Sequence, residues 1–157
     1  MQNMNSSAAH HAKAAMLIRK PVNEVYEAFI NPAITTLFWF THSNGRLDVN
    51  KNVEWTWEMY NDTASVTVKE IIQDQKIIIE WGKEYNITTV EWSFKSLPQG
   101  TFVEIINNGF SGNDDALTAQ VRDSTEGFTL VLAGLKALLE HNVQLNLVGD
   151  RFPPGLA

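Results

Sequence analysis

Residues 53–60 read VEWTWEMY, and this stretch decides how the chain folds. Within it, apolar side chains alternate with polar or amphipathic ones: Val53, Trp55, Trp57 and Met59 against Glu54, Thr56, Glu58 and Tyr60. A period of two is typical of a β-strand that buries one face and exposes the other. Two tryptophans give the buried face a large aromatic area, which either fills a core or walls a cavity. The pattern alone leaves both alternatives open.

Further short strands follow at regular intervals along the chain. Turn residues such as Asn61-Asp62 and Leu97-Pro98-Gln99-Gly100 separate segments of strand-like composition, which cover residues 64–72, 76–82, 88–94 and 101–110. This spacing predicts an antiparallel meander. Together with a first strand at residues 14–18, we expect a sheet of about seven strands.

Two short helices are predicted between the first strand and the meander. Pro21 is well placed to open the first helix, which carries apolar residues on one face. Asn31-Pro32 then ends that helix and begins the second, because Asn caps helices and Pro is tolerated in the first turn. The second helix runs into an aromatic cluster of Phe38, Trp39 and Phe40.

A long helix is predicted near the C-terminus, from Asp114 to His141. Asp114 and Asp115 offer an N-terminal cap, and a broad apolar stripe follows: Phe128, Val131, Leu132, Leu135, Leu138 and Leu139. Gly127 predicts a break between a short and a long helical piece, and Gly134 predicts extra space beside the helix. Beyond the helix, the alternation of Val143, Leu145 and Leu147 predicts an extended arm.

Composition narrows the class of protein. A chain of 157 residues fits a single domain, which we place at residues 13–157 after a loosely ordered lead-in of residues 1–12. It has no cysteine, which excludes disulfides and thiolate chemistry and favours a cytoplasmic location. The net charge is −6 with 12 scattered basic residues, so we expect no nucleic-acid partner. No apolar run is long enough to span a membrane.

The sequence predicts neither a metal nor a cofactor. His10 and His11 are adjacent, and no other histidine or carboxylate lies at a spacing that would complete a metal site with them. Gly109, Gly112 and Gly127 are too far apart for a phosphate-binding loop. We also find no set of nucleophile, base and orienting group, so no residue is predicted to be catalytic.

Three stretches, in their order and spacing, resemble a known family. They are PVNEVYEAFINPAITTLFWF (21–40), VTVKEIIQDQKIIIEW (66–81) and EGFTLVLAGLKALLEH (126–141). They are similar to the Pro-led opening, the central hairpin and the leucine-rich terminal helix of the START-like or SRPBCC superfamily, which includes the birch-pollen allergen fold. The chain resembles in particular the branch of the activator of heat-shock protein ATPase. It departs from that branch at residues 38–41, where relatives often carry paired Trp and Gly-Pro.

The resemblance implies an α+β helix-grip fold, in which a long C-terminal helix lies across a curved antiparallel sheet with two short helices. It also implies a protein that binds an apolar small molecule, such as a lipid or polyketide, between sheet and helix. Two alternatives stay open. One is an interaction or co-chaperone-like module with a protein partner, and the other is an enzyme of the polyketide cyclase type.

Alternation along the strands then predicts which residues would line the space between the sheet and the long helix. The inward aromatic candidates are Trp55, Trp57, Trp81, Trp92 and Phe94, with Phe38 and Leu135 from the helical side. Asn107 and Tyr26 are the polar candidates, because each could orient a ligand by hydrogen bonding. The simpler interpretation is that Asn107 bonds to neighbouring backbone and that Tyr26 caps the core. His42 is expected at the surface.

Overall fold

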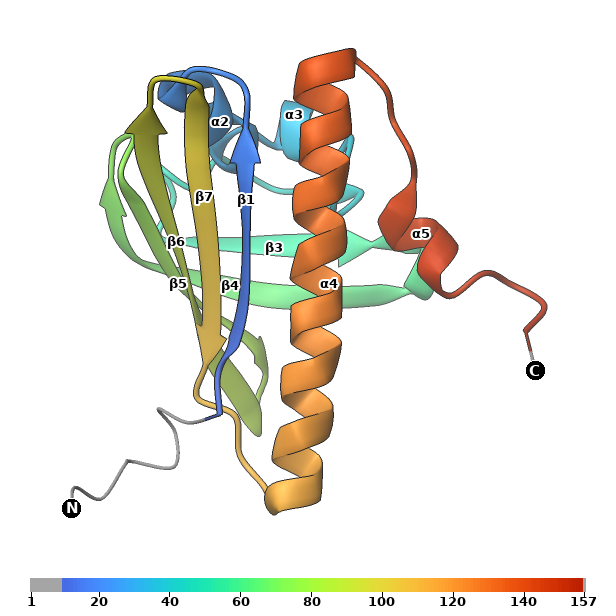
Figure 1. The fold of residues 1–157 in the computed structure, drawn as a ribbon. Coiled ribbons are helices and arrows are strands. Elements are labelled where there is room, and N and C mark those ends of the chain that lie inside the picture. The colour runs from blue at the N-terminus through green and yellow to red at the C-terminus, as the bar shows by residue number, and fades with distance from the viewer. Residues whose placement is uncertain (1–9, 157) are drawn as a thin grey trace.

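The computed structural model describes residues 10–156 as an antiparallel sheet with helices packed against it (Figure 1). The strands of this described part are β1 (Ala12–Ile18), β2 (His42–Ser43), β3 (Asn52–Trp57), β4 (Asp62–Ile72), β5 (Lys76–Lys83), β6 (Asn86–Leu97) and β7 (Gly100–Asn108). Its helices are α2 (Val22–Ile30), α3 (Pro32–Thr35), α4 (Asp114–His141) and α5 (Leu147–Arg151). This is the predicted α+β helix-grip arrangement, including its seven-stranded sheet.

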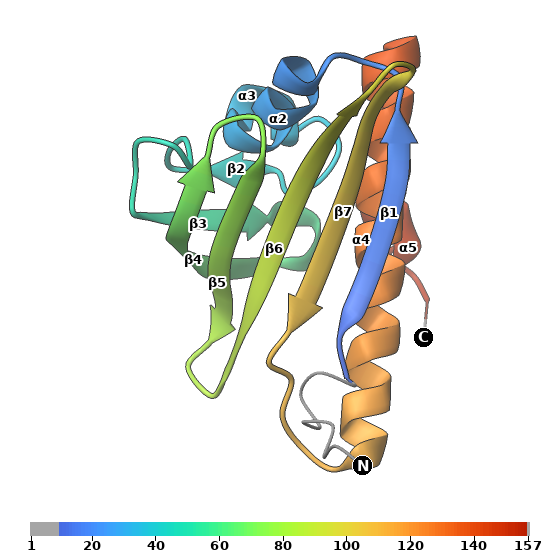
Figure 2. The ribbon, with the colours of Figure 1, turned by 60° about the vertical axis from the view of Figure 1, so that its left-hand side comes forward.

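The sheet is a meander to which the first strand returns. Its spatial order is β1-β7-β6-β5-β4-β3-β2, so β1 pairs with β7, and Ala14 lies opposite Ile105. Figure 2 shows α4 beside the β1 edge and the two short helices α2 and α3 at the upper end of the sheet, where α2 contacts β6 and β7. A register shift between Val68 and Glu70 interrupts the pairing of β4 with β5. Such bulges bend a strand, which helps the sheet to curve around the core.

The junction between α2 and α3 forms as the sequence predicts. The side-chain oxygen of Asn31 accepts a hydrogen bond from the backbone nitrogen of Ala33 at 3.0 Å, and Pro32 occupies the first turn of α3. Because the two helices turn sharply here, the segment after α3 brings Phe38, Trp39 and Phe40 into the interior.

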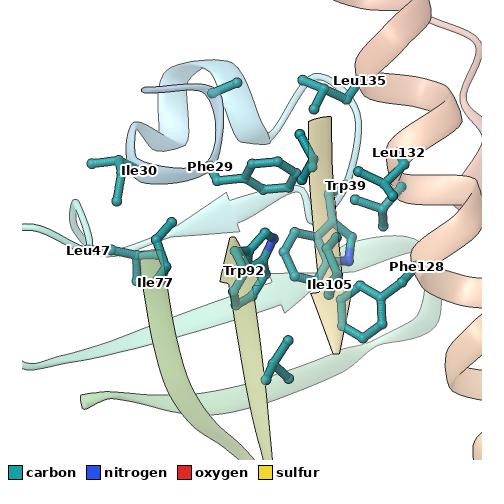
Figure 3. Close-up of a cluster of buried hydrophobic side chains, with 14 of the residues drawn as sticks. Phe29, Ile30, Trp39, Leu47, Ile77, Trp92, Ile105, Phe128, Leu132 and Leu135 are labelled. Carbon is teal, nitrogen blue, oxygen red and sulfur yellow. The ribbon is translucent and has the colours of Figure 1, made fainter. Parts of the chain in front are cut away.

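The core is an aromatic cluster centred on Trp39. Figure 3 shows Phe29 from α2, Trp92 from β6 and Phe128 from α4 converging on this side chain. The ring centroid of Trp39 lies 6.5 Å from that of Phe29, 6.0 Å from that of Trp92 and 5.7 Å from that of Phe128. The pairs with Phe29 and Phe128 are edge to face, a geometry that stabilises a core beyond the area it buries. Trp39 therefore connects β6 to both α2 and α4.

The strand that contains the tryptophans is shorter than its alternation predicts. β3 ends at Trp57, and Glu58–Tyr60 form a 3₁₀ turn that closes at Asn61 with a φ of 48°. Met59, which the alternation placed on the buried face, is 40% exposed. The prediction for Met59 was wrong because Asn61 readily adopts the left-handed conformation, which turns the chain before the strand pattern is complete.

Helix α4 differs from the prediction in two respects. It is continuous from Asp114 to His141, so Gly127 does not break it, and its N-cap is Asn113, whose side chain accepts from Ala116 N at 2.9 Å. Gly134 does not widen the space beside the helix either. A Cβ at residue 134 would lie 3.4 Å from the backbone oxygen of Phe38, so this glycine allows a close approach. No helix in residues 10–156 is long and apolar enough to cross a membrane.

The segment after α4 is only partly the predicted extended arm. Val143 and Leu145 are exposed, but α5 begins at Leu147, so the alternation does not continue. The hydroxyl of Tyr60 donates to the backbone oxygen of Val148, and this bond holds α5 beside the end of β3. Most of the predicted lead-in, residues 1–9, lies outside the described residues.

Candidate ligand cavity

A cavity of about 430 Å³ lies beside the middle of α4. Its floor comes from the ends of β5, β6 and β7 that approach the start of this helix, and the C-terminal segment forms one side. Small-molecule sites in proteins are concave, mostly apolar and commonly 300–1,000 Å³ in volume. The cavity meets these criteria, and we take it as the candidate functional site.

The inner wall of the cavity is aromatic and aliphatic. Trp81 lines it from β5, Trp39 lines it from the segment after α3, and Phe128 and Val131 line it from α4. The ring centroids of Trp81 and Phe128 are 5.8 Å apart, so these two side chains meet where the sheet approaches the helix. The wall offers an apolar surface to a ligand rather than charge.

One buried polar cluster interrupts this wall. Asn107 is 3% exposed, and its side-chain nitrogen donates to Thr88 Oγ1 and to the backbone oxygen of Thr89, both at 2.9 Å. Ser124 Oγ on α4 donates to Asn107 Oδ1 at 2.8 Å, and Trp81 Nε1 donates to Thr88 Oγ1 at 3.1 Å. The carbonyl of Thr89 can only accept, so it determines which end of the Asn107 amide carries the nitrogen. The cluster thus joins β6, β7 and α4 at the polar end of the cavity.

The mouth of the cavity is formed by charged and aromatic residues of the C-terminal segment. Arg151 pairs with Glu126 on α4 through a short contact, and its guanidinium carbon lies 4.2 Å from the ring centroid of Phe152. Hydrogen bonding to Glu126 raises the pKa of Arg151 further, so the side chain is charged at every ordinary pH. The ion pair links α5 to α4, and Phe152 lies at the opening.

A second hollow adjoins the first around Trp81. It measures about 490 Å³ and shares Tyr60, Trp81 and Val148 with the main cavity. Trp57 and Ala64 extend its wall toward β3 and β4. Trp81 therefore lines both concave spaces.

Three of the nine predicted site residues lie at these spaces. Trp81 and Asn107 line the main cavity, and Trp57 lines the adjoining hollow. Asn107 does point inward, and it also makes the backbone hydrogen bond of the simpler interpretation. Ligand binding by these residues stays a prediction.

The other six lie away from the main cavity. Trp55 and Trp92 are each 1% exposed, and Leu135 is fully buried, in the packed core. Phe94 and Tyr26 contact each other edge to face at 5.6 Å toward the end covered by α2. Phe38 lies under Gly134, where a smaller hollow opens on its far side.

Several cavity residues escaped the sequence analysis. Ser124 lies four residues before Phe128, so helical spacing could have placed it on the same face of α4. Thr88 stands two residues before Val90, and strand alternation could have placed it inward. Arg151 and Phe152 carried no such signal, because they reach the cavity only through the path of the C-terminal segment.

A separate, polar hollow lies at the far end of the sheet, around Tyr26. Arg46 forms a two-pronged ion pair with Glu27 at 2.8 and 3.0 Å and also bonds Asp48 at 2.9 and 3.0 Å. Hydrogen bonds from Arg46 hold the pKa of both carboxyls below their ordinary values. Burial, reinforced by Asp48, raises the pKa of Tyr26 to about 12, so its hydroxyl stays protonated. These groups satisfy one another, which favours a structural role.

The residues that could support metal or acid–base chemistry are dispersed. Within residues 10–156, no three or more His, Asp or Glu side chains are grouped to hold a metal ion. His42 lies on β2, where it is exposed, away from the cavity. Asp123 at the mouth is the carboxylate that lines the cavity.

Comparison with known proteins identifies the family of this chain and solved structures with a similar fold. The profile of the family described as activator of Hsp90 ATPase homolog 1-like protein matches residues 19–140, which is more than half of the chain. No curated protein gives a significant match. Among solved structures, protein SSP2350 from Staphylococcus saprophyticus is similar with a TM-score of 0.74 and 26% identity, over 86% of this chain and 95% of that one.

Two further structures share the fold at lower identity. DynU16, from the dynemicin biosynthetic locus, has a TM-score of 0.75 and 15% identity over 86% of this chain, which spans 49% of DynU16. The Aha1 dimer from Colwellia psychrerythraea has a TM-score of 0.69 and 12% identity, over 83% of this chain and 96% of that one. At these identities the likeness extends to the fold alone.

Proposed function

Because the chain belongs to the family of activator of Hsp90 ATPase homolog 1-like proteins, we propose that it binds a small apolar molecule in the cavity beside the middle of α4. The observation that carries the proposal is the composition of that cavity, which has aromatic and aliphatic walls and one buried polar cluster. An apolar ligand gains roughly 25 cal/mol for each Å² of surface that it removes from water. The polar cluster would then orient the ligand, and the C-terminal segment would cover it.

The test is the binding of a neutral fluorescent probe, N-phenyl-1-naphthylamine, followed by its emission and by the melting temperature of the protein. Gly127 lines the cavity, and a Cβ at this position would meet no atom within 4 Å, so it can carry a blocking side chain. Gly127→Trp should weaken probe binding roughly tenfold or more, because the indole occupies apolar area that the probe would bury. Gly127→Ala is the matched control and should bind as the wild type does.

Two outcomes would count against the proposal. If the probe and a broad panel of apolar compounds leave both emission and melting temperature unchanged, the cavity is not a binding site. If Gly127→Trp binds the probe as tightly as Gly127→Ala, binding occurs elsewhere on the protein.

A cyclase-type enzyme is the second candidate, and the observation that favours it is the fold shared with DynU16, a protein of a biosynthetic locus. Such an enzyme would act by folding a reactive chain within the cavity. Turnover of a polyketide chain should then fall in Ser124→Ala, while binding of the fluorescent probe stays unchanged. If no chain is converted at any protein concentration, this candidate is abandoned and the binding role stands.

An interaction module is the remaining alternative from the sequence. It rests on acidic side chains on the outer face of the sheet, which would bind a basic partner. Two of these are already paired, since Glu80 contacts Lys69 at 3.2 Å and Glu104 contacts Lys13 at 3.1 Å. These pairs reduce the charge available to a partner, so we rank this alternative below ligand binding.

A further inference from the structure

The hydroxyl of Thr88 has an unusual position in the polar cluster of the cavity. Its oxygen accepts two hydrogen bonds, from Trp81 Nε1 at 3.1 Å and from Asn107 Nδ2 at 2.9 Å. A hydroxyl oxygen has two acceptor positions, so both are occupied, and the group can act further only as a donor. No acceptor for its hydrogen is found in the described part of the chain. Thr88 is 7% exposed and lines the cavity.

The neighbours of Thr88 cannot supply that acceptor by turning. The amide of Asn107 is held in one orientation, because its nitrogen also donates to the carbonyl of Thr89 and its oxygen accepts from Ser124. The indole nitrogen of Trp81 is itself only a donor. A buried donor without a partner is unfavourable, so an acceptor that enters the cavity would be stabilised at this point.

We propose that Thr88 is the donor that selects the ligand, and that the ligand class is a neutral apolar molecule carrying a hydrogen-bond acceptor such as a ketone oxygen. This inference rests on the proposed function. A carboxylate fits poorly, because Thr88 offers one donor within an apolar wall and a buried anion needs more than that. The cationic Arg151 is at the mouth and is already paired with Glu126, and Asp123 lines the same mouth.

The experiment compares benzophenone with diphenylmethane, which has the same two rings but lacks the carbonyl. Dissociation constants are measured by calorimetry for the wild type, for Thr88→Val, and for Thr88→Ser as the variant that keeps the hydroxyl. In Thr88→Val, the preference for benzophenone over diphenylmethane should fall by about threefold to tenfold, the usual worth of one hydrogen bond. In Thr88→Ser the preference should match that of the wild type. Diphenylacetate, the anion on the same scaffold, should bind the wild type more weakly than either.

Thr88→Val leaves the donors of Trp81 and Asn107 without their acceptor and so destabilises the protein. A second measurement therefore uses the wild type alone. The carbonyl infrared band of benzophenone bound to the wild type should lie at lower frequency than in hexane, because a hydrogen bond weakens the carbonyl. A band at the hexane position would overturn the inference, as would a ligand preference that Thr88→Val leaves unchanged or a diphenylacetate affinity above that of benzophenone. If benzophenone, diphenylmethane, N-phenyl-1-naphthylamine and the broad panel of apolar compounds all fail to bind, the proposed function fails and this inference with it. If the probe binds but benzophenone does not, or if both diphenyl compounds bind without a role for Thr88, only the inference fails.

Discussion

Trp55 and Trp81 lie on the same concave face of the sheet, but their surroundings differ. Trp55 is 1% exposed and stacks on Phe40 with 4.6 Å between ring centroids, in the end of the molecule covered by the segment after α3. Trp81 is only partly buried and lines both concave spaces. The comparison shows that facing inward does not decide between core and cavity. The segments that pack over each side chain decide whether it belongs to the core or to the cavity wall.

Polar groups follow the same division between the two ends. In the packed end, the indole nitrogen of Trp92 is buried with no hydrogen-bond partner among the described residues. In the cavity end, the indole nitrogen of Trp81 donates to Thr88, and the cluster around Asn107 satisfies further groups. Buried aromatic and aliphatic side chains fill the first end, whereas the second combines apolar walls with a cluster of hydrogen bonds.

The largest expected effect tests this contrast at the two tryptophans. Trp55→Ala should lower the free energy of unfolding by about 3–5 kcal/mol, because it leaves a cavity in a packed core. Trp81→Ala should cost about 2 kcal/mol, since part of its surface already faces open space and one hydrogen bond is lost. Chemical denaturation measures both values. Equal losses would mean that the two ends are packed to the same degree.

The second test places the same leucine at two positions of α4. Gly134→Leu should destabilise the protein by about 1–3 kcal/mol, because the side chain would collide with Phe38 in the packed end. Gly127→Leu should instead stabilise it by about 1 kcal/mol, since leucine favours helix more than glycine does and nothing crowds the site. Melting curves of both variants against the wild type decide the matter. Stabilisation by both would show that α4 does not press on Phe38.

The smallest expected effect concerns the ion pairs of Arg46 beyond the packed end. Arg46→Met should lower stability by about 0.5–1 kcal/mol at pH 7, a modest value because the groups are partly exposed to solvent. The folded-state pKa values of Glu27 and Asp48 lie below their ordinary 4.5 and 3.8. Their stabilising contribution is therefore complete above about pH 4.5 and is lost as pH falls through the lowered values.

The measurement is the difference in unfolding free energy between wild type and Arg46→Met at several pH values. This difference should shrink as the solution is acidified below pH 4.5. Lys83→Met, which breaks an exposed ion pair with Asp62, is the matched control and should show a smaller difference throughout. If the difference in unfolding free energy stays constant down to the pH of acid unfolding, Arg46 contributes through packing rather than charge.

The fold could be predicted largely from the sequence, and the cavity only in part. Strand alternation placed Val90, Trp92 and Phe94 on the inward face, where all three are buried, because a period of two is a property of the extended backbone. The same alternation placed Met59 wrongly, because a pattern of apolar and polar residues does not reveal the turn that ends at Asn61. It also could not separate Trp55 from Trp81, because both occupy inward positions and the difference lies in segments that are distant in sequence.

The sequence by itself determined the order of elements, the inward face of each strand and the apolar face of α4. These depend on local periodicity, on the capping of α3 by Asn31 and on turn residues, all of which act over a few positions. Only the tertiary structure decided that Trp55 is enclosed at one end of the concave face while α5 and Arg151 border an open space at the other. That outcome depends on how helices and the C-terminal segment pack across the sheet. Such packing is set by the combined shapes of many side chains, which no single stretch of sequence contains.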